Sequence, residues 1–96
     1  MICKKHFLAD GRMILVVVDD ELVGKRFEEG DLQIDLSKDF YKGEEVSEAE
    51  VVGLFRKAYI IHLVGEKAVE LGIKEGYVDR NRVVKIAGVK HAEVLC

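Results

Sequence analysis

The chain has 96 residues, of which 49% are hydrophobic and 34% are charged, and its formal net charge is −3. This composition supplies enough apolar side chains for one folded core and excludes a disordered chain, and the length leaves no room for a second domain. The longest apolar run, Met13–Val18, is too short to cross a membrane, so we expect a single cytoplasmic domain over residues 1–96. The negative charge argues against broad, non-specific nucleic-acid binding but leaves room for a local basic patch.

The chain opens with the pattern of a β-hairpin. Ile2–Leu8 and Met13–Asp19 flank Asp10-Gly11, a strong hairpin signal because glycine accepts a positive φ at the turn. Ile14–Val18 is apolar on both faces, which predicts a central strand that is covered on each side.

Less regular structure is expected next. Asp20–Phe27 is predicted to form a turn or a short helix, which the carboxylate of Asp19 or Asp20 caps. Apolar residues then alternate with polar ones over Leu32–Leu36, the pattern of a strand with one solvated face.

A helix is predicted to begin at Ser47, which forms a capping box with Glu50. An apolar stripe with helical spacing follows: Val51, Leu54, Phe55, Ala58 and His62. The stripe changes phase after His62, so we predict a break near Ile61–Leu63 and two helices of about 13 residues each. Gly76 would end the second helix in a left-handed conformation.

The last part of the chain has the pattern of a second hairpin. Asp79–Asn81 reads as a turn, Arg82–Ile86 and Lys90–Leu95 as strands, and Gly88 lies at the turn between them. The predicted order is β-β-β-α-α-β-β. It gives an α+β fold with a mainly antiparallel sheet of about five strands and two helices packed on one face.

Three residues are weak candidates for catalysis or metal binding: His62, Glu66 and His91. On a continuous helix His62 and Glu66, four residues apart, could reach one ion or one proton. We favour a buried or capping histidine beside a solvent-facing glutamate, because no third ligand has the spacing of a metal site.

The cysteines give no framework for a disulfide or a metal. Cys3 and Cys96 lie at opposite ends of the chain without spaced partners, so reduced thiols are expected. A zinc site that joins them to His6 and His91 would need a bulge, because residues three apart on a strand point to opposite faces. We therefore predict no metal and no cofactor.

Two motifs bear on ligand binding. Gly24-Lys25 fails as a phosphate-binding loop, because Asp19 stands where that motif needs a glycine. Phe40 and Tyr41, followed by Lys42, could stack on a nucleic-acid base. The alternative, which we favour, is an aromatic plug that closes one end of the core.

The predicted C-terminal hairpin is rich in basic residues: Arg80, Arg82, Lys85 and Lys90. These charges suit an RNA backbone or an acidic protein, or they serve only to protect an edge strand from aggregation. A strip of small residues, Gly65, Ala68 and Gly72, predicts close packing within the monomer or across a dimer axis.

One set of residues extends over essentially the whole chain: Gly24-Lys25, Phe27, Glu29-Gly30, Leu32, Phe40-Tyr41, Gly43, Leu63-Val64-Gly65-Glu66, Ala68-Val69-Glu70 and His91-Ala92. With these residues the chain resembles DUF424, a small archaeal family of unknown function. The resemblance implies a cytoplasmic archaeal single-domain protein and supplies no activity. In the family pattern an asparagine commonly stands at His62 and a proline at Lys90. An asparagine there would cap a second helix, so the resemblance implies an architectural role for His62.

The leading hypothesis is a non-catalytic binding module for RNA or for a ribonucleoprotein or protein partner. Its candidate contact residues are Lys25, Phe40, Tyr41, Lys42, Arg82 and Lys85. Two alternatives remain: a small enzyme or metal protein built on the histidines, and a structural subunit of a homodimer or larger homo-oligomer. In that subunit the acidic first half of the chain would pair with the basic second half.

Overall fold

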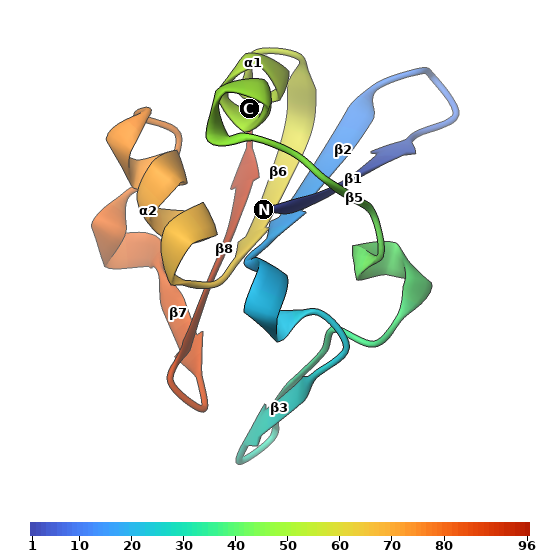
Figure 1. Ribbon diagram of the computed structural model, residues 1–96. Helices are drawn as coiled ribbons and strands as arrows, with labels where there is room; N and C mark the ends of the chain where they lie inside the picture. Colours follow the sequence, from blue (N-terminus) through green and yellow to red (C-terminus); the bar gives the residue numbers. More distant parts are fainter.

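The computed structural model describes residues 1–96 and contains eight strands, two α-helices and three short 3₁₀ turns (Figure 1). The strands are β1 (Ile2–Phe7), β2 (Met13–Val18), β3 (Arg26–Glu29), β4 (Leu32–Asp35), β5 (Glu44–Glu45), β6 (Ala58–Val64), β7 (Val84–Ile86) and β8 (Val89–Leu95). The helices are α1 (Glu48–Phe55) and α2 (Glu66–Lys74), and the 3₁₀ turns are η1 (Asp20–Leu22), η2 (Asp39–Tyr41) and η3 (Arg80–Arg82).

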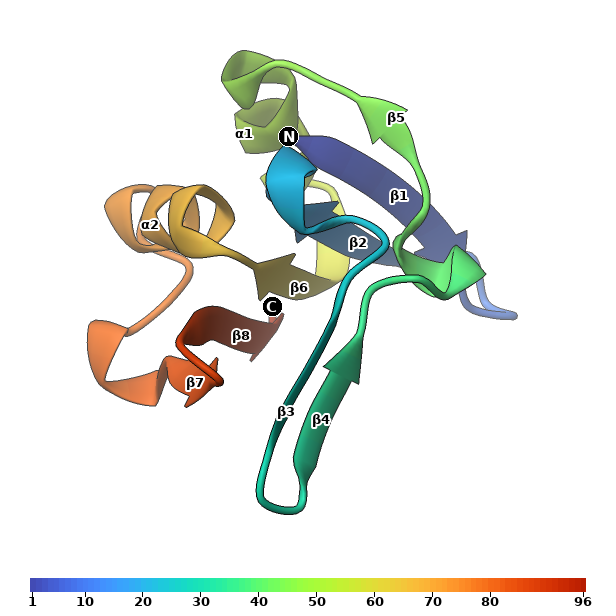
Figure 2. The ribbon, with the colours of Figure 1, turned by 60° about the horizontal axis from the view of Figure 1, so that its bottom comes forward.

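Six of the strands form one sheet in the order β5-β1-β2-β6-β8-β7, and β3 and β4 form a separate hairpin. Only β2 and β6 run parallel, whereas every other pair in the sheet is antiparallel. Figure 2 shows both helices on one side of the sheet and the β3–β4 hairpin on the other. The predicted α+β class is therefore confirmed, with a sheet of six strands rather than about five.

The prediction of two long, consecutive helices is wrong. Ala58–Val64 is the strand β6, which lies between β2 and β8, so α1 has only eight residues and α2 nine. This segment is rich in aromatic and β-branched residues and is hydrogen-bonded on both sides, which stabilises a strand. The apolar residues over 51–62 therefore recur at helical spacing only by coincidence, since the first of them belong to a short helix and the last to a strand.

The two predicted hairpins are present. In the first, Ile2 pairs with Val18 and Gly11 has φ +89°. In the second, Ala87 and Gly88 have φ +50° and +80°, the positive values of a two-residue hairpin turn. The seventh strand begins at Val84 and not at Arg82, because residues 80–82 form η3.

Each face of the sheet has its own apolar core. On the helix face, side chains of β2 and β6 such as Leu15 and Ile61 pack against α1 and α2. On the opposite face, which we call the outer face, Val16 and Val64 pack against Ile34 and other residues of the 19–41 segment. Both faces of β2 are thus covered, which confirms its predicted central position.

The N-terminus of α2 is capped by a residue far away in the sequence. The carboxylate of Asp19, only 2% exposed, accepts hydrogen bonds from the backbone amides of Lys67 (2.9 Å) and Ala68 (2.8 Å). Gly65 has φ +109°, and a Cβ atom on it would lie 2.4 Å from the carboxyl carbon of Asp19. Of the two alternatives for His62, a buried or a capping histidine, the capping one does not occur, because Asp19 caps α2. Asp19 makes no capping bond to η1.

The C-terminus of α2 ends as predicted. Gly76 has φ +84°, its amide donates to Ile73, and the amide of Tyr77 donates to Gly72. These two bonds form the Schellman arrangement that satisfies the last carbonyl groups of a helix.

Gly72→Ala is expected to lower the free energy of unfolding by about 1–2 kcal/mol. A Cβ atom at this position would lie 2.5 Å from Leu63 Cδ1 and 2.9 Å from Val78 Cγ2, so both side chains must shift. Gly53→Ala in α1 is the matched control, because its Cβ atom would have no neighbour within 4 Å and alanine is the better helix former. Urea unfolding that finds equal effects for both variants would contradict this account.

The small-residue strip is explained within one chain, since Gly65 packs against Asp19 and Gly72 against Leu63 and Val78.

Neither helix has the length and apolar surface that crossing a membrane requires.

Candidate functional site

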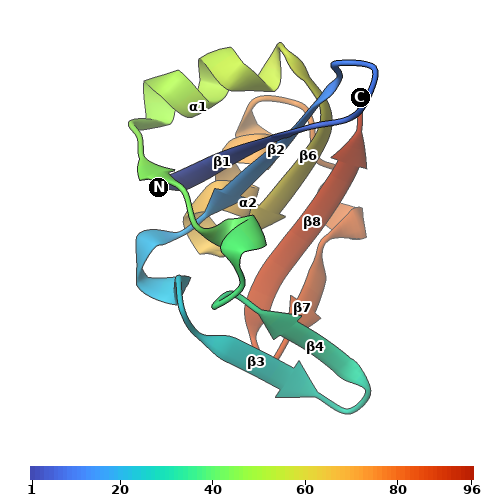
Figure 3. The ribbon, with the colours of Figure 1, turned by 90° about the vertical axis from the view of Figure 1, so that its right-hand side faces the viewer.

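The three histidines gather on the outer face of the sheet. His6 lies on β1, His62 on β6 and His91 on β8, and the strand register places Glu93 directly opposite His62. The 3₁₀ turn η2 packs against this face over β1 and β2 (Figure 3). Strands that are distant in sequence thus bring the histidines close to one another.

The closest contact in this cluster joins two imidazole rings. Nε2 of His62 lies 2.9 Å from Nε2 of His91, and Glu93 Oε2 lies 3.5 Å from Nδ1 of His62. Burial lowers the pKa of His62 to about 4, and the neighbouring His91 contributes to this shift. Burial also lowers the pKa of His91, against the opposing effect of Glu93. Both rings are therefore neutral at pH 7.

Phe40 and Tyr41 cover the histidines. The ring of Phe40 stacks on His6 with 4.4 Å between ring centres, and both Phe40 and Tyr41 lie 5.8 Å from the ring of His62. His6 Nε2 is also 2.9 Å from the backbone oxygen of Phe40. Tyr41 is half-buried, and Phe40 is 37% exposed. The pair thus packs on the outer face of the sheet and leaves the ring of Phe40 partly accessible.

Glu66 does not join the histidines. It is exposed at the start of α2, where its carboxylate lies 3.0 Å from Lys90 Nζ. His62 lies on the strand β6 and Glu66 on the helix α2, so the alternative that placed both on one continuous helix does not occur. Glu93 stands beside His62 instead.

Half of the basic residues near the C-terminal hairpin are already paired. Lys90 contacts Glu66 and Glu70, and Arg80 lies 2.8 Å from Glu70. The hydrogen bonds from Arg80 and Lys90 lower the pKa of Glu70 to about 2. Arg82 and Lys85 are exposed without an ion pair. The remaining predicted residues lie apart: Lys25 precedes β3, and Lys42 follows η2 and pairs with Asp39 at 3.6 Å.

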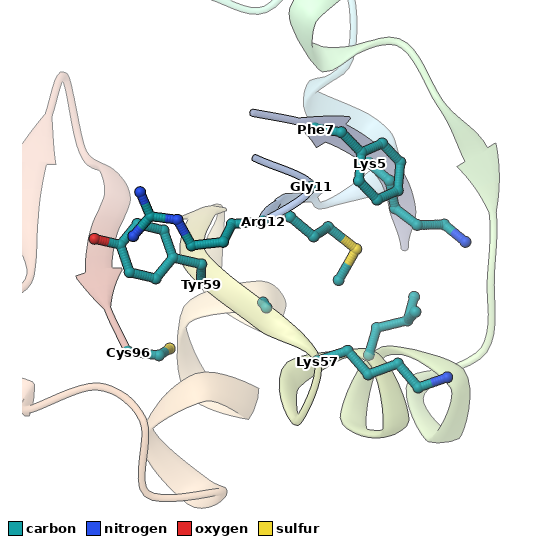
Figure 4. Close-up of a pocket in the computed structure, with 10 residues that line it drawn as sticks. Lys5, Phe7, Gly11, Arg12, Lys57, Tyr59 and Cys96 are labelled. Carbon is teal, nitrogen blue, oxygen red and sulfur yellow. The ribbon is translucent and has the colours of Figure 1, made fainter. Parts of the chain in front are cut away.

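A pocket of about 550 Å³ lies at the end of the sheet where β1 turns into β2 and α1 leads into β6 (Figure 4). We call it the basic pocket and define it by Lys5, Phe7, Arg12, Lys57 and Tyr59. No acidic side chain lines it. The pocket is therefore a local site of positive charge on a chain whose net charge is negative.

Two contacts hold Arg12 in the basic pocket. Its guanidinium lies 3.9 Å from the centre of the Tyr59 ring, a cation–π contact, and its Nε atom is 2.6 Å from the carboxylate of Asp10. Phe7 is 67% exposed, which is unusual for so large an apolar side chain. The pocket thus presents ordered charge beside an uncovered aromatic ring.

Comparison with known protein families identifies the family of the chain. The model of the family described as "Protein of unknown function (DUF424)" matches residues 8–96. The chain belongs to the DUF424 family. Within the basic pocket of this DUF424 chain, Arg12, Lys57 and Tyr59 lie inside the matched range, whereas Lys5 and Phe7 precede it.

A solved structure shows the same fold. The DUF424 chain is similar to an uncharacterized conserved protein from Methanopyrus kandleri, with a TM-score of 0.82, 20% sequence identity and coverage of 98% of this chain and 90% of that one. The comparison with curated proteins gives no match. An archaeal protein therefore shares the architecture of this DUF424 chain, and the likeness concerns the fold alone.

Proposed function

We propose that the chain is a binding module for single-stranded RNA and that the basic pocket holds one nucleotide of the strand. The observation that carries this proposal is the combination of three cationic side chains, two aromatic rings and no acidic side chain in one pocket. A binding function is the class that the sequence predicts. The principal contact with RNA is now expected in the basic pocket, at the end of β8 opposite the turn of the C-terminal hairpin.

The charges of the basic pocket suit a phosphate group. Lys5 and Lys57 are exposed and have no ion pair, so no internal contact must break when they bind an anion. Arg12 keeps a fixed orientation through Tyr59 and Asp10, which lowers the entropy lost on binding. Arginine and lysine contacts to phosphate supply most of the affinity in nucleic-acid complexes.

The aromatic rings suit a base. Every nucleic-acid base has a flat face that stacks on an aromatic side chain, at about 1–3 kcal/mol per base. Phe7 is 67% exposed and offers such a face beside Lys5, and the volume of about 550 Å³ lies within the range of small-ligand sites. One nucleotide can therefore place its base and its phosphate in the same pocket.

Lys57→Glu is expected to weaken binding of a fluorescein-labelled decauridylate at least about 10-fold, because it replaces an attractive contact to phosphate by a repulsive one. Fluorescence anisotropy at several salt concentrations measures this effect. For the wild-type protein the slope of log affinity against log salt should be about −0.7 for each phosphate that the pocket neutralises on a single strand. Phe7→Ala should weaken binding about 10-fold through lost stacking.

Two controls locate the site. Lys74→Glu makes the same change of charge on the exposed end of α2 and should leave the affinity almost unchanged. The double variant Arg82→Glu, Lys85→Glu tests the C-terminal hairpin. If that variant abolishes binding while Lys57→Glu has no effect, the basic pocket is not the site. If the wild-type protein does not bind the oligonucleotide at low salt, the proposed function is wrong.

A further inference from the structure

We propose that His62 and His91 form a two-histidine binding site for a divalent transition-metal ion on the outer face of the sheet. This site is separate from the basic pocket and does not depend on RNA binding. It rests on the position of two ring nitrogens and on the carboxylate behind one of them.

The spacing of the two nitrogens fits one ion. A metal–imidazole bond is about 2.0–2.1 Å long, so two nitrogens that are 2.9 Å apart subtend an angle of about 90° at a shared ion. The ring centres are 4.5 Å apart. Rings that point straight at each other across a hydrogen bond of this length would have centres more than about 5 Å apart. The shorter distance means that the ring axes are tilted away from the line between the nitrogens, which is compatible with a shared ion.

The carboxylate of Glu93 lies beside the ring nitrogen of His62 that does not face His91. Its Oε2 atom lies 3.5 Å from Nδ1 of His62, and a proton on Nδ1 is therefore stabilised there. In that tautomer Nε2 of His62 has no proton, and its lone pair accepts the hydrogen bond from Nε2–H of His91. A metal ion would replace this hydrogen bond once His91 carries its proton on Nδ1. Metal-binding histidines commonly donate this second ring proton to a carboxylate, which orients the ring.

An angle of about 90° favours octahedral and square-planar ions over tetrahedral ones. Tetrahedral zinc sites would place two nitrogens about 3.3 Å apart, whereas octahedral and square-planar ions place neighbouring ligands at right angles. No group of three or more histidine, cysteine, aspartate or glutamate side chains is arranged to hold a metal, so water molecules would complete the coordination. Nickel(II) and copper(II) fit this nitrogen site best.

His6 provides an internal control for metal binding by His62 and His91. His6 stacks on Phe40, and its Nε2 atom is engaged at 2.9 Å by the backbone oxygen of Phe40. It shares the outer face with His62 and His91 but directs this nitrogen elsewhere. His6→Ala removes a histidine from the same surface without removing a proposed ligand.

Isothermal titration of untagged protein with nickel(II) tests the proposal. Nickel is used because copper(II) reacts with thiols, and Cys96→Ser is introduced in every sample to remove the exposed thiol. We expect one nickel ion per chain, bound more tightly than zinc(II). His62→Ala and His91→Ala should each raise the dissociation constant at least about 10-fold, and Glu93→Gln about 10-fold.

Circular dichroism confirms that each variant is folded, and Glu93→Gln keeps both rings in place if either alanine variant unfolds. Affinity of His6→Ala equal to that of the parent protein supports the site. Two results would overturn the proposal: the absence of nickel binding at millimolar metal, or equal affinity in the His62, His91 and Glu93 variants. The second result would place the ion at a chain terminus.

Discussion

Asp19→Ala is expected to lower the free energy of unfolding by about 3–4 kcal/mol, the largest effect that we predict for a single side chain. The variant would leave the buried amide of Ala68 and the partly buried amide of Lys67 without this partner. Each hydrogen bond to a charged group contributes about 1.5–3 kcal/mol, and the carboxylate also interacts favourably with the positive end of α2. The loss should therefore exceed that of an ordinary N-cap.

Thermal unfolding measures this effect as a fall in melting temperature of roughly 15–25 °C for a domain of this size. The neighbouring Asp20 supplies the control, because its exposed carboxylate forms an ion pair with the N-terminal amino group. Asp20→Ala should lower the free energy of unfolding far less than Asp19→Ala does, because an exposed ion pair contributes little to stability. Equal losses for the two variants would show that the bonds from Asp19 to α2 do not stabilise the fold.

The unfolding free energy of the wild-type protein is expected to fall as the pH drops from about 6.5 to about 4, and His62 is the main cause. Its pKa is 6.5 when it is free and about 4 in the fold, so in this range the unfolded chain binds a proton that the folded chain does not. The stabilising contribution of neutral His62 is complete above pH 6.5 and is lost below it. A shift of this size corresponds to at most about 3 kcal/mol.

The groups that face His62 modify this profile. His91, whose pKa is also lowered, adds to the loss, whereas Glu93 favours protonation of His91 and reduces it. His62→Gln removes the titrating ring, so its stability should change less over the same range. Urea unfolding of both proteins at several pH values between 4.5 and 7.5 makes the comparison. Parallel profiles would mean that His62 is protonated as easily in the fold as in the unfolded chain.

The parts of the fold that sequence predicted depend on local chemistry. Gly11 permits the first turn, and Ala87-Gly88 forms the second, because Gly11, Ala87 and Gly88 have positive φ values. The strand β6 was missed because its identity depends on partners: β2 and β8 are both distant in sequence, and their hydrogen bonds override the helical spacing of its apolar residues.

The candidate sites were predictable only in part. Sequence indicated His62 and His91 as single residues, but their contact depends on the register between β6 and β8. The basic pocket was missed because its residues come from three separate segments, around Lys5, Arg12 and Lys57, and no motif joins them. The available signal was a lysine two positions before an aromatic residue, which occurs twice: Lys5 with Phe7 and Lys57 with Tyr59.

The parallel pairing of β2 with β6 has a consequence for how the chain folds. Val16 pairs with His62, 46 residues later, and the whole segment that contains β3, β4, β5 and α1 lies between them. The entropy lost in closing this loop makes the central pair slower to form than the local β1–β2 and β7–β8 hairpins. Until it forms, one edge of the apolar strand β2 has no partner. The greatest risk of association between chains therefore falls in that interval, before β6 covers this edge.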